Sequence, residues 1–225
     1  AEALAKCPVG TYAYFDTPYQ PFGDGFVCAK ALDDRVGCYT ILELMRETYP
    51  CDVTFVFAVQ EEVGCRGAKV GSYTVNPDFA IAVDVTHGTT PDAGKPRTFD
   101  CGSGVAIGLN LEGTAANDLG CVDDQFKVCR PTQGVAVSFM DGSSIGQRKL
   151  FKEILDLAEH EHIPHQIKRG VTGSNDASAY QRAAAGCLTC VLSVPCRYIH
   201  SGASVAYLED IQSQYELVRA FLMHA

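Results

Sequence analysis

Several apolar runs in this sequence lack the alternating polar face of a half-exposed strand, and they constrain the fold more than any other feature. The runs are FAIAVDV (79–85), GVAIGL (104–109), GVAVSFM (134–140), CLTCVLSV (187–194) and DVTFVFAVQ (52–60). Strands of this composition are typical of a sheet that is covered on both faces. We therefore expect these segments to form a buried central layer.

Segments with the apolar spacing of amphipathic helices lie between these runs. They are residues 36–49, residues 143–161 with Ser143 and Ser144 as the expected N-cap, residues 175–186 ending on Gly186, and the stretch from Leu208 to the C-terminus. Strands that alternate with helices predict an α/β layered fold with a largely parallel sheet.

The first part of the chain has a different character. The stretch GTYAYFDTPYQPFGDGFVCAKAL (10–32) is rich in aromatic residues and is broken by prolines and by a Gly-Asp-Gly turn. This pattern predicts short strands in a hairpin. We place a boundary at the turn, between residues 1–22 and residues 23–225.

Composition excludes several classes of partner. The net charge of −9, without clustered Lys and Arg, argues against nucleic-acid binding. The 11 cysteines are odd in number and widely scattered, so we interpret them as reduced thiols, with Cys187 and Cys190 as structural residues. No window approaches the roughly 20 apolar residues of a membrane span, and the first residues lack a signal-peptide core. We expect a cytoplasmic protein without a membrane partner.

Acidic and imidazole groups occur where the predicted strands end. They are Asp33 and Asp34 in ALDDRVG, Glu61 and Glu62 in QEEVG, Asp84 and His87 in AVDVTHG, and His200 in RYIHSG. In a doubly wound sheet such strand ends meet at one edge, where ligands bind. Clustered carboxylates at this edge require cations.

The adjacent carboxylates of Glu61 and Glu62 allow more than one interpretation. A glycosidase acid and nucleophile would flank the scissile bond at a set separation, whereas neighbours on a strand point to opposite faces. A metal ligand beside a free general base fits this geometry, because one carboxylate binds the ion while the other holds a proton. An ordinary ion-pair network is the alternative that residue chemistry leaves open.

The remaining histidines carry a weaker signal. His160, His162 and His165 lie in EHEHIPH, but positions i and i+2 of a helix do not share a face, so we expect a solvated helix end. His224 is expected to be exposed near the C-terminus. His200 follows a buried run, a position that by itself is more typical of a core histidine than of a ligand.

Five motifs together point to a family. AKALDDRVGCY, VQEEVGCRGA, AIAVDVTHGT, GSNDASAYQ and VLSVPCRYIHS occur in an order and spacing that resemble the tetrahedral-type aminopeptidases. This family comprises glutamyl and leucyl aminopeptidases and includes proteins called endoglucanase M. The resemblance covers nearly the whole chain from about residue 25 onward.

The resemblance implies a phosphorylase/hydrolase-like catalytic domain, a three-layer αβα sandwich with a mostly parallel mixed sheet. It also implies two divalent ions, zinc or cobalt, bridged by an aspartate and a water. Asp33 matches the bridging ligand, Glu62 and His200 complete one metal site, and Asp84 belongs to the other. Glu61 matches the general base. Related dinuclear peptidases have a cis peptide after the bridging aspartate, which predicts one between Asp33 and Asp34.

The sequence departs from the family at its N-terminal side. Members carry an earlier His-x-Asp motif, whose histidine binds the second metal, and then an inserted β-rich dimerisation domain. No histidine precedes residue 87 here. We therefore expect residues 1–22 to be a remnant of the inserted domain and residues 23–225 to be an incomplete catalytic domain. The family builds homo-dodecamers, whereas this chain is expected to remain monomeric or to form a non-native oligomer.

The expected function is metal-dependent removal of N-terminal residues from peptides, with at most one tight metal in this chain. The alternative is a catalytically dead homologue or fragment with a binding or regulatory role. Polysaccharide hydrolysis is disfavoured, because the site lacks the paired carboxylates of that chemistry.

Overall fold

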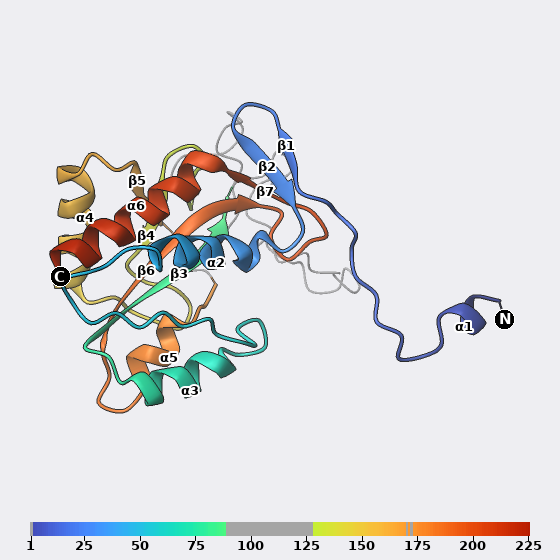
Figure 1. Ribbon diagram of the computed structural model, residues 1–225, viewed down its shortest axis with the longest axis horizontal. Coiled ribbons are helices and arrows are strands. Elements are labelled where there is room, and N and C mark those ends of the chain that lie inside the picture. Colours follow the sequence, from blue (N-terminus) through green and yellow to red (C-terminus); the bar gives the residue numbers. More distant parts are fainter. Residues whose placement is uncertain (1, 89–127, 170, 172) are drawn as a thin grey trace, which may run out of the picture.

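The computed structural model describes residues 2–88, 128–169, 171 and 173–225 (Figure 1). The helices are α1 (Glu2–Lys6), α2 (Leu32–Leu44), α3 (Arg66–Val75), α4 (Arg148–His160), α5 (Ala177–Arg182) and α6 (Leu208–His224). The strands are β1 (Gln20–Phe22), β2 (Phe26–Ala29), β3 (Phe79–His87), β4 (Val135–Ser138), β5 (His165–Ile167), β6 (Leu188–Arg197) and β7 (Ser204–Tyr207).

The described strands form one mixed sheet in the order β1-β2-β7-β6-β4-β5, and β3 pairs with β6. The β3–β6 and β4–β5 pairings are parallel, and the β3–β6 ladder runs from Phe79 opposite Leu188 to His87 opposite Cys196. The other four described pairings are antiparallel. The predicted mixed sheet is confirmed. Antiparallel pairings nevertheless outnumber parallel ones in the described part, and the hairpin contributes to this because it joins the sheet through β7.

Helices cover both faces of this sheet, which confirms the three-layer αβα architecture (Figure 1). On one side, α2, α4 and α6 pack over the strands, and on the other side lie α3 and α5. The main core lies between β4, β6, α4 and α6, where Val135, Ile154, Leu192 and Leu217 are fully buried. Strand β6 is buried almost throughout because helices lie on both of its faces, as its unbroken apolar run predicts.

One predicted strand does not form. Residues 52–60 form no regular secondary structure and have no sheet partner among the described residues, and Phe57 and Val59 are exposed. A groove of about 760 Å³ lies between residues 52–58 and β3. Apolar composition makes a strand only where a neighbour offers backbone hydrogen bonds, and here the groove occupies that place.

Element ends also differ from the expectations. The N-terminal hairpin is confirmed, since β1 and β2 pair antiparallel around residues 23–25. Helix α4 begins at Arg148, because Ser143 and Ser144 donate to the Asp141 carboxylate instead of capping the helix. Helix α5 ends at Arg182, before Gly186.

Other expectations are confirmed or fall outside the described part. The C-terminal helix spans Leu208–His224 as expected. The predicted strand 104–109 lies outside the described residues. The described helices are all too short or too polar to cross a bilayer. The boundary between residues 1–22 and 23–225 stays a prediction, and it falls at the turn of the β1–β2 hairpin.

Candidate metal centre

Four separate segments carry the predicted site residues. Asp33 lies just after β2, where the first residues of α2 have non-helical dihedral angles. Glu61 and Glu62 occupy the turn before α3, and Asp84 lies on β3. His200 follows β6 in the loop to β7 and has a left-handed φ of 58°. The peptide bond between Asp33 and Asp34 is cis, as predicted.

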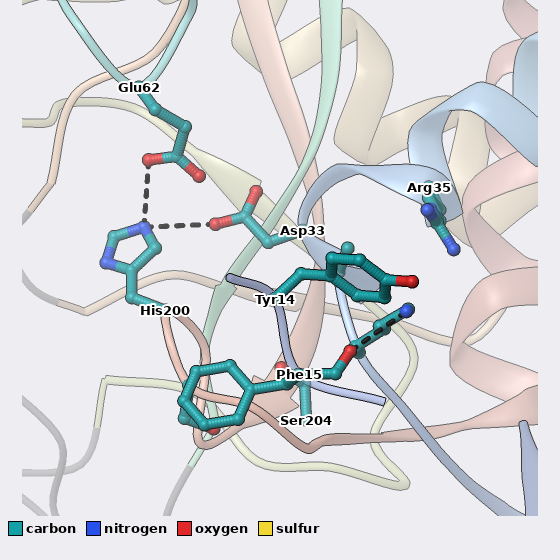
Figure 2. Close-up of a pocket in the computed structure, with 10 residues that line it drawn as sticks. Tyr14, Phe15, Asp33, Arg35, Glu62, His200 and Ser204 are labelled. Atoms are coloured by element: carbon teal, nitrogen blue, oxygen red, sulfur yellow. Dashed lines mark hydrogen bonds and ion pairs between the residues drawn. The ribbon is translucent and has the colours of Figure 1, made fainter. Parts of the chain in front are cut away.

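Three of the predicted ligands converge. His200 Nε2 lies 3.0 Å from Asp33 Oδ2 and 3.2 Å from Glu62 Oε2 (Figure 2). One ligand atom from each residue lies within 4.8 Å of the others. In a tetrahedral zinc site with bonds of about 2.0–2.2 Å, neighbouring N and O ligands lie about 3.3 Å apart. The contacts of His200 with Asp33 and with Glu62 therefore match the spacing of ligand atoms that bind the same ion.

This cluster is accessible from solvent. The side chain of Asp33 is 15% exposed, that of His200 42% and that of Glu62 56%. A pocket of about 510 Å³ opens in front of them, and Tyr14 and Phe15 of the N-terminal segment line its far side (Figure 2). Lys30 Nζ donates to the Phe15 carbonyl at 2.9 Å and keeps this segment beside the pocket. An ion bound by this cluster would therefore face a pocket that a small molecule can enter.

The electrostatics of the cluster show an excess of negative charge. Burial and the charge of Glu62 together raise the pKa of Asp33 from 3.8 to about 6, although His200 acts in the opposite direction. Burial raises the pKa of Asp34 to about 8, although the Gly37 amide donates to its carboxylate at 2.9 Å. A divalent cation would relieve both effects, because it offsets desolvation and repulsion together. The donor set of two carboxylates and one imidazole therefore fits zinc, cobalt or manganese.

Asp84 does not belong to the three-residue cluster in the described structure. Its Oδ1 accepts a hydrogen bond from the Val85 amide at 2.7 Å. Burial raises its pKa well above the usual range, and Asp34 and Asp33 are its principal charged neighbours. Asp84 thus lies near enough to interact electrostatically with the cluster, and its role as a ligand of a second ion stays a prediction.

Glu61 and Glu62 point into different surroundings. Glu62 contacts His200, whereas Glu61 Oε1 lies 3.6 Å from Cys65 Sγ. Burial raises the pKa of Glu61 to about 7, and Glu62 and Asp176 add to the rise. A carboxylate with a pKa near neutrality can both accept and return a proton, so the environment of Glu61 suits the role predicted for it.

Sequence reasoning missed a buried polar network behind the site. Gln214 Nε2 donates to the carbonyls of Asp84 at 2.9 Å and Leu192 at 2.7 Å, and its Oε1 accepts from Thr40 Oγ1 at 2.8 Å. This network fixes α6 and α2 against the strand that carries Asp84. Only a polar residue on the apolar face of the last helix signalled it. Sequence reasoning also missed the need for a glycine at position 37. A Cβ on Gly37 would lie 2.3 Å from Asp34 Oδ2, too close for the carboxylate to keep its place.

Three of the other histidines are exposed as expected, whereas the expectation of a solvated helix end is wrong for His165, which is half-buried in a strand. His160 is exposed at the end of α4 and pairs with Glu161, and His162 and His224 are also exposed. His165 lies in β5, where its Nδ1 lies 2.9 Å from the Ile163 carbonyl oxygen. The His87 ring packs edge-on to that of His200 at 6.2 Å, and burial lowers its pKa to about 4. His87 is therefore neutral near pH 7.

Comparison with known proteins identifies relatives of this arrangement. The family model described as M42 glutamyl aminopeptidase matches residues 1–119 and 106–217. A putative aminopeptidase of Acetivibrio thermocellus is 34% identical over 220 residues, which are 96% of this chain and 57% of that protein.

Solved structures give the same result. An aminopeptidase from the archaeon Desulfurococcus kamchatkensis superimposes with a TM-score of 0.78 at 30% identity, over 94% of this chain and 52% of that one. The TET1 peptidase of Pyrococcus horikoshii, which assembles into a tetrahedron or a large octahedral shell, gives a TM-score of 0.70 at 27% identity, over 94% and 54%. The chain thus spans about half the length of the curated relatives it matches. Through its family model and these relatives, the chain belongs to the M42 glutamyl aminopeptidase family.

Proposed function

We propose that this chain carries the metal-binding part of an aminopeptidase that hydrolyses N-terminal residues from peptides. The observation that carries the proposal is the convergence of Asp33, Glu62 and His200, with Glu61 beside them but outside their cluster. Membership of a family of aminopeptidases supports the same chemistry. Peptide substrates are the partners that this reaction requires.

Asp33, Glu62 and His200 would hold one divalent ion, zinc or cobalt. A bound ion supplies Lewis-acid polarisation of the peptide carbonyl and lowers the pKa of water. Glu61 would take a proton from the attacking water and deliver it to the departing amine. The raised pKa of Glu61, about 7, lets one group perform both steps near neutral pH.

Within the part of the chain that the structure describes, a second ion of the dinuclear centre would have Asp33 and Asp84 as its expected protein ligands. Two carboxylates bind zinc weakly, whereas three protein ligands and an open position are typical of a catalytic site. We therefore infer that Asp33, Glu62, Asp84 and His200 together bind at most one ion tightly, and that the isolated chain is a poor peptidase. We further infer that residues 1–22 belong to a dimerisation domain and that the protein is cytoplasmic.

Glu61→Gln tests the assignment of the base. The amide cannot accept the proton, so turnover of an aminoacyl p-nitroanilide in added zinc or cobalt should fall by about 100-fold or more. With one equivalent of added zinc, metal content measured by mass spectrometry after dialysis should equal that of the unmodified chain, because Glu61 is not a ligand of the site formed by Asp33, Glu62 and His200. The matched control is Glu159→Gln on the exposed side of α4. An active Glu61→Gln protein would remove Glu61 from this role.

A binding or regulatory homologue without activity is the second candidate, because Asp33 and Asp84 by themselves would hold a second ion weakly. The same assay separates the two candidates. No measurable hydrolysis with one equivalent of zinc or cobalt bound per chain would favour the binding protein.

A further inference from the structure

A second group of metal-ligand side chains lies on the other side of Glu61. Glu61, Cys65 and Asp176 each place one ligand atom within 4.8 Å of the other two. They come from two segments far apart in the sequence, the turn that begins α3 and the start of α5. These two helices pack against each other, and Cys65, Ala68 and Ala179 form a small core between them.

The backbone holds these three side chains in place. The amide of Cys65 donates to the Glu61 carbonyl at 2.9 Å, which folds the turn back on itself. On the other segment, buried Asn175 donates to Asp141 at 2.8 Å and accepts from the Ala177 amide at 3.0 Å. Asp176 is thereby anchored on both sides, and the cluster does not depend on a free loop.

The spacing of the donors is that of a metal site. Cys65 Sγ lies 3.6 Å from Glu61 Oε1. In a tetrahedral zinc site with a Zn–S bond of about 2.3 Å and a Zn–O bond of about 2.0 Å, a sulfur and an oxygen ligand lie about 3.5 Å apart. Cys65 is only 7% exposed, whereas Glu61 and Asp176 are half-buried and line the groove, so an ion held there would be shielded on the Cys65 side and reachable from the groove.

A separate observation concerns the carboxylate of Asp176. Its Oδ1 has almost no accessible surface and accepts no hydrogen bond. Buried polar atoms are nearly always satisfied, and an absent ion is one of the few physical explanations for an exception. Within the described part of the chain, neither Glu61 nor Asp176 forms an ion pair with a Lys, Arg or His. The Asp176 carboxylate interacts with the Cys65 thiol, and its unsatisfied Oδ1 leaves a place that a cation would fill.

The charges support the same conclusion. Burial raises the pKa of Cys65 to about 12, and Glu61 and Asp176 are its principal charged neighbours. Burial also raises the pKa of Asp176. Three groups that repel one another when ionised share a partly dry site, and a divalent cation would stabilise all three anionic forms at once.

We propose that Glu61, Cys65 and Asp176 form a second cation site, specific for thiophilic divalent ions such as zinc, cobalt or cadmium. Binding would release the thiol proton to solvent and form one metal–sulfur and two metal–oxygen bonds. The thiolate distinguishes this site from the cluster of Asp33, Glu62 and His200, which has only oxygen and nitrogen donors.

Occupation of this site would inhibit the enzyme, an inference that rests on the proposed function. An ion bound to the Glu61 carboxylate removes the lone pairs that the base needs. Excess zinc should therefore inhibit the reaction that a first ion supports, and Cys65→Ser should relieve that inhibition.

The binding test uses cobalt chloride added to the whole, reduced, metal-free chain. A thiolate ligand to cobalt gives a charge-transfer band in the near ultraviolet, which oxygen and nitrogen ligands do not give. We expect the band in the unmodified chain, and its loss in Cys65→Ser with a fall of at least about 100-fold in affinity at this site. Cys7→Ser, on the exposed N-terminal segment, is the matched control and should keep the band.

Two further variants keep the proposal falsifiable. Asp176→Asn should weaken the cobalt affinity that the band reports, even if Cys65→Ser folds poorly. Asp33→Ala should lose the first site but keep the band, so failure of the proposed function leaves this result unchanged. A band absent at saturating cobalt, a band equal in Cys65→Ser and the unmodified chain, or a band lost in Asp33→Ala would each overturn the separate site.

Discussion

The carboxylate of Asp34 makes the stability of the metal-free protein depend on pH. Burial raises the pKa of Asp34 from 3.8 to about 8, and the charges of Asp33, Glu61 and Asp176 contribute. The folded state therefore holds a proton that the unfolded chain has already lost above about pH 4. Because the folded state binds more protons in this range, the free energy of unfolding falls as pH rises.

The best window for the measurement lies between about pH 6.5 and about pH 8. Below about pH 6.5, His87 makes the free energy of unfolding rise with pH. Burial lowers the pKa of His87 from 6.5 to about 4, so folding favours its neutral form. Within the window, a carboxyl group that is protonated only in the folded state lowers the free energy of unfolding by about 1.4 kcal/mol for each pH unit. Over this range, Asp34 alone should lower the free energy of unfolding by about 2 kcal/mol.

Substitution of Asp34 by Asn isolates this contribution. The amide oxygen can still accept from the Gly37 amide, which donates to Asp34 at 2.9 Å, but the side chain no longer ionises. Urea denaturation followed by circular dichroism, in the presence of a chelator, should show a fall between the two pH values that is smaller by about 2 kcal/mol in Asp34→Asn. Part of the fall should remain, because burial also raises the pKa of Glu61 and of Asp210 to about 7.

The control is Glu159→Gln, which removes one exposed charge from α4 and should keep the full pH dependence. Zinc added near pH 8 should restore stability to the unmodified protein, because a cation replaces the lost protons. The reasoning is refuted if the unmodified metal-free protein is equally or more stable near pH 8, or if Asp34→Asn shows the same fall.

Two further predictions concern the sheet and its polar network. Backbone amides of residues 53–58 should exchange with deuterium far faster than those of β6, since residues 53–58 have no sheet partner among the described residues. The measurement is hydrogen exchange followed by mass spectrometry. Equal protection of the two segments would mean that a partner strand pairs with residues 53–58. Gln214→Leu should lower the free energy of unfolding by about 2–3 kcal/mol or more, because it leaves two buried carbonyls and the Thr40 hydroxyl without a partner. In urea denaturation, the double variant Thr40→Val with Gln214→Leu should lose less stability than the sum of the two single variants, whereas strict additivity would mean that the two residues do not interact.

The amino-acid sequence by itself determined the layers and most of the elements. Unbroken apolar runs predicted the strands β3, β4 and β6, because a sheet covered on both sides accommodates them. Strands β4 and β6 are buried as expected, whereas β3, which lies beside the groove, is mostly half-buried. Helical spacing predicted α2 and α6, and the Gly-Asp-Gly turn predicted the hairpin. These features depend on local pattern, which the chain carries whatever surrounds it.

Tertiary structure decided what depends on partners. Residues 52–60 have the composition of a strand, but a strand requires a neighbour for its backbone hydrogen bonds, and a groove lies there instead. Ser143 and Ser144 were predicted to form an N-cap, but in the structure they donate hydrogen bonds to Asp141, which the local turn brings close.

The site divides in the same way. Residue types and family resemblance predicted which carboxylates and imidazole would meet, but only the fold determined that Glu62 turns to His200 while Glu61 turns to Cys65 and Asp176. Adjacent residues differ in surroundings because their side chains leave the backbone in different directions, and packing of α3 on α5 supplies the second group of neighbours. Through-space distances between side chains from separate segments set the charge balance here, and no pattern along the chain contains them.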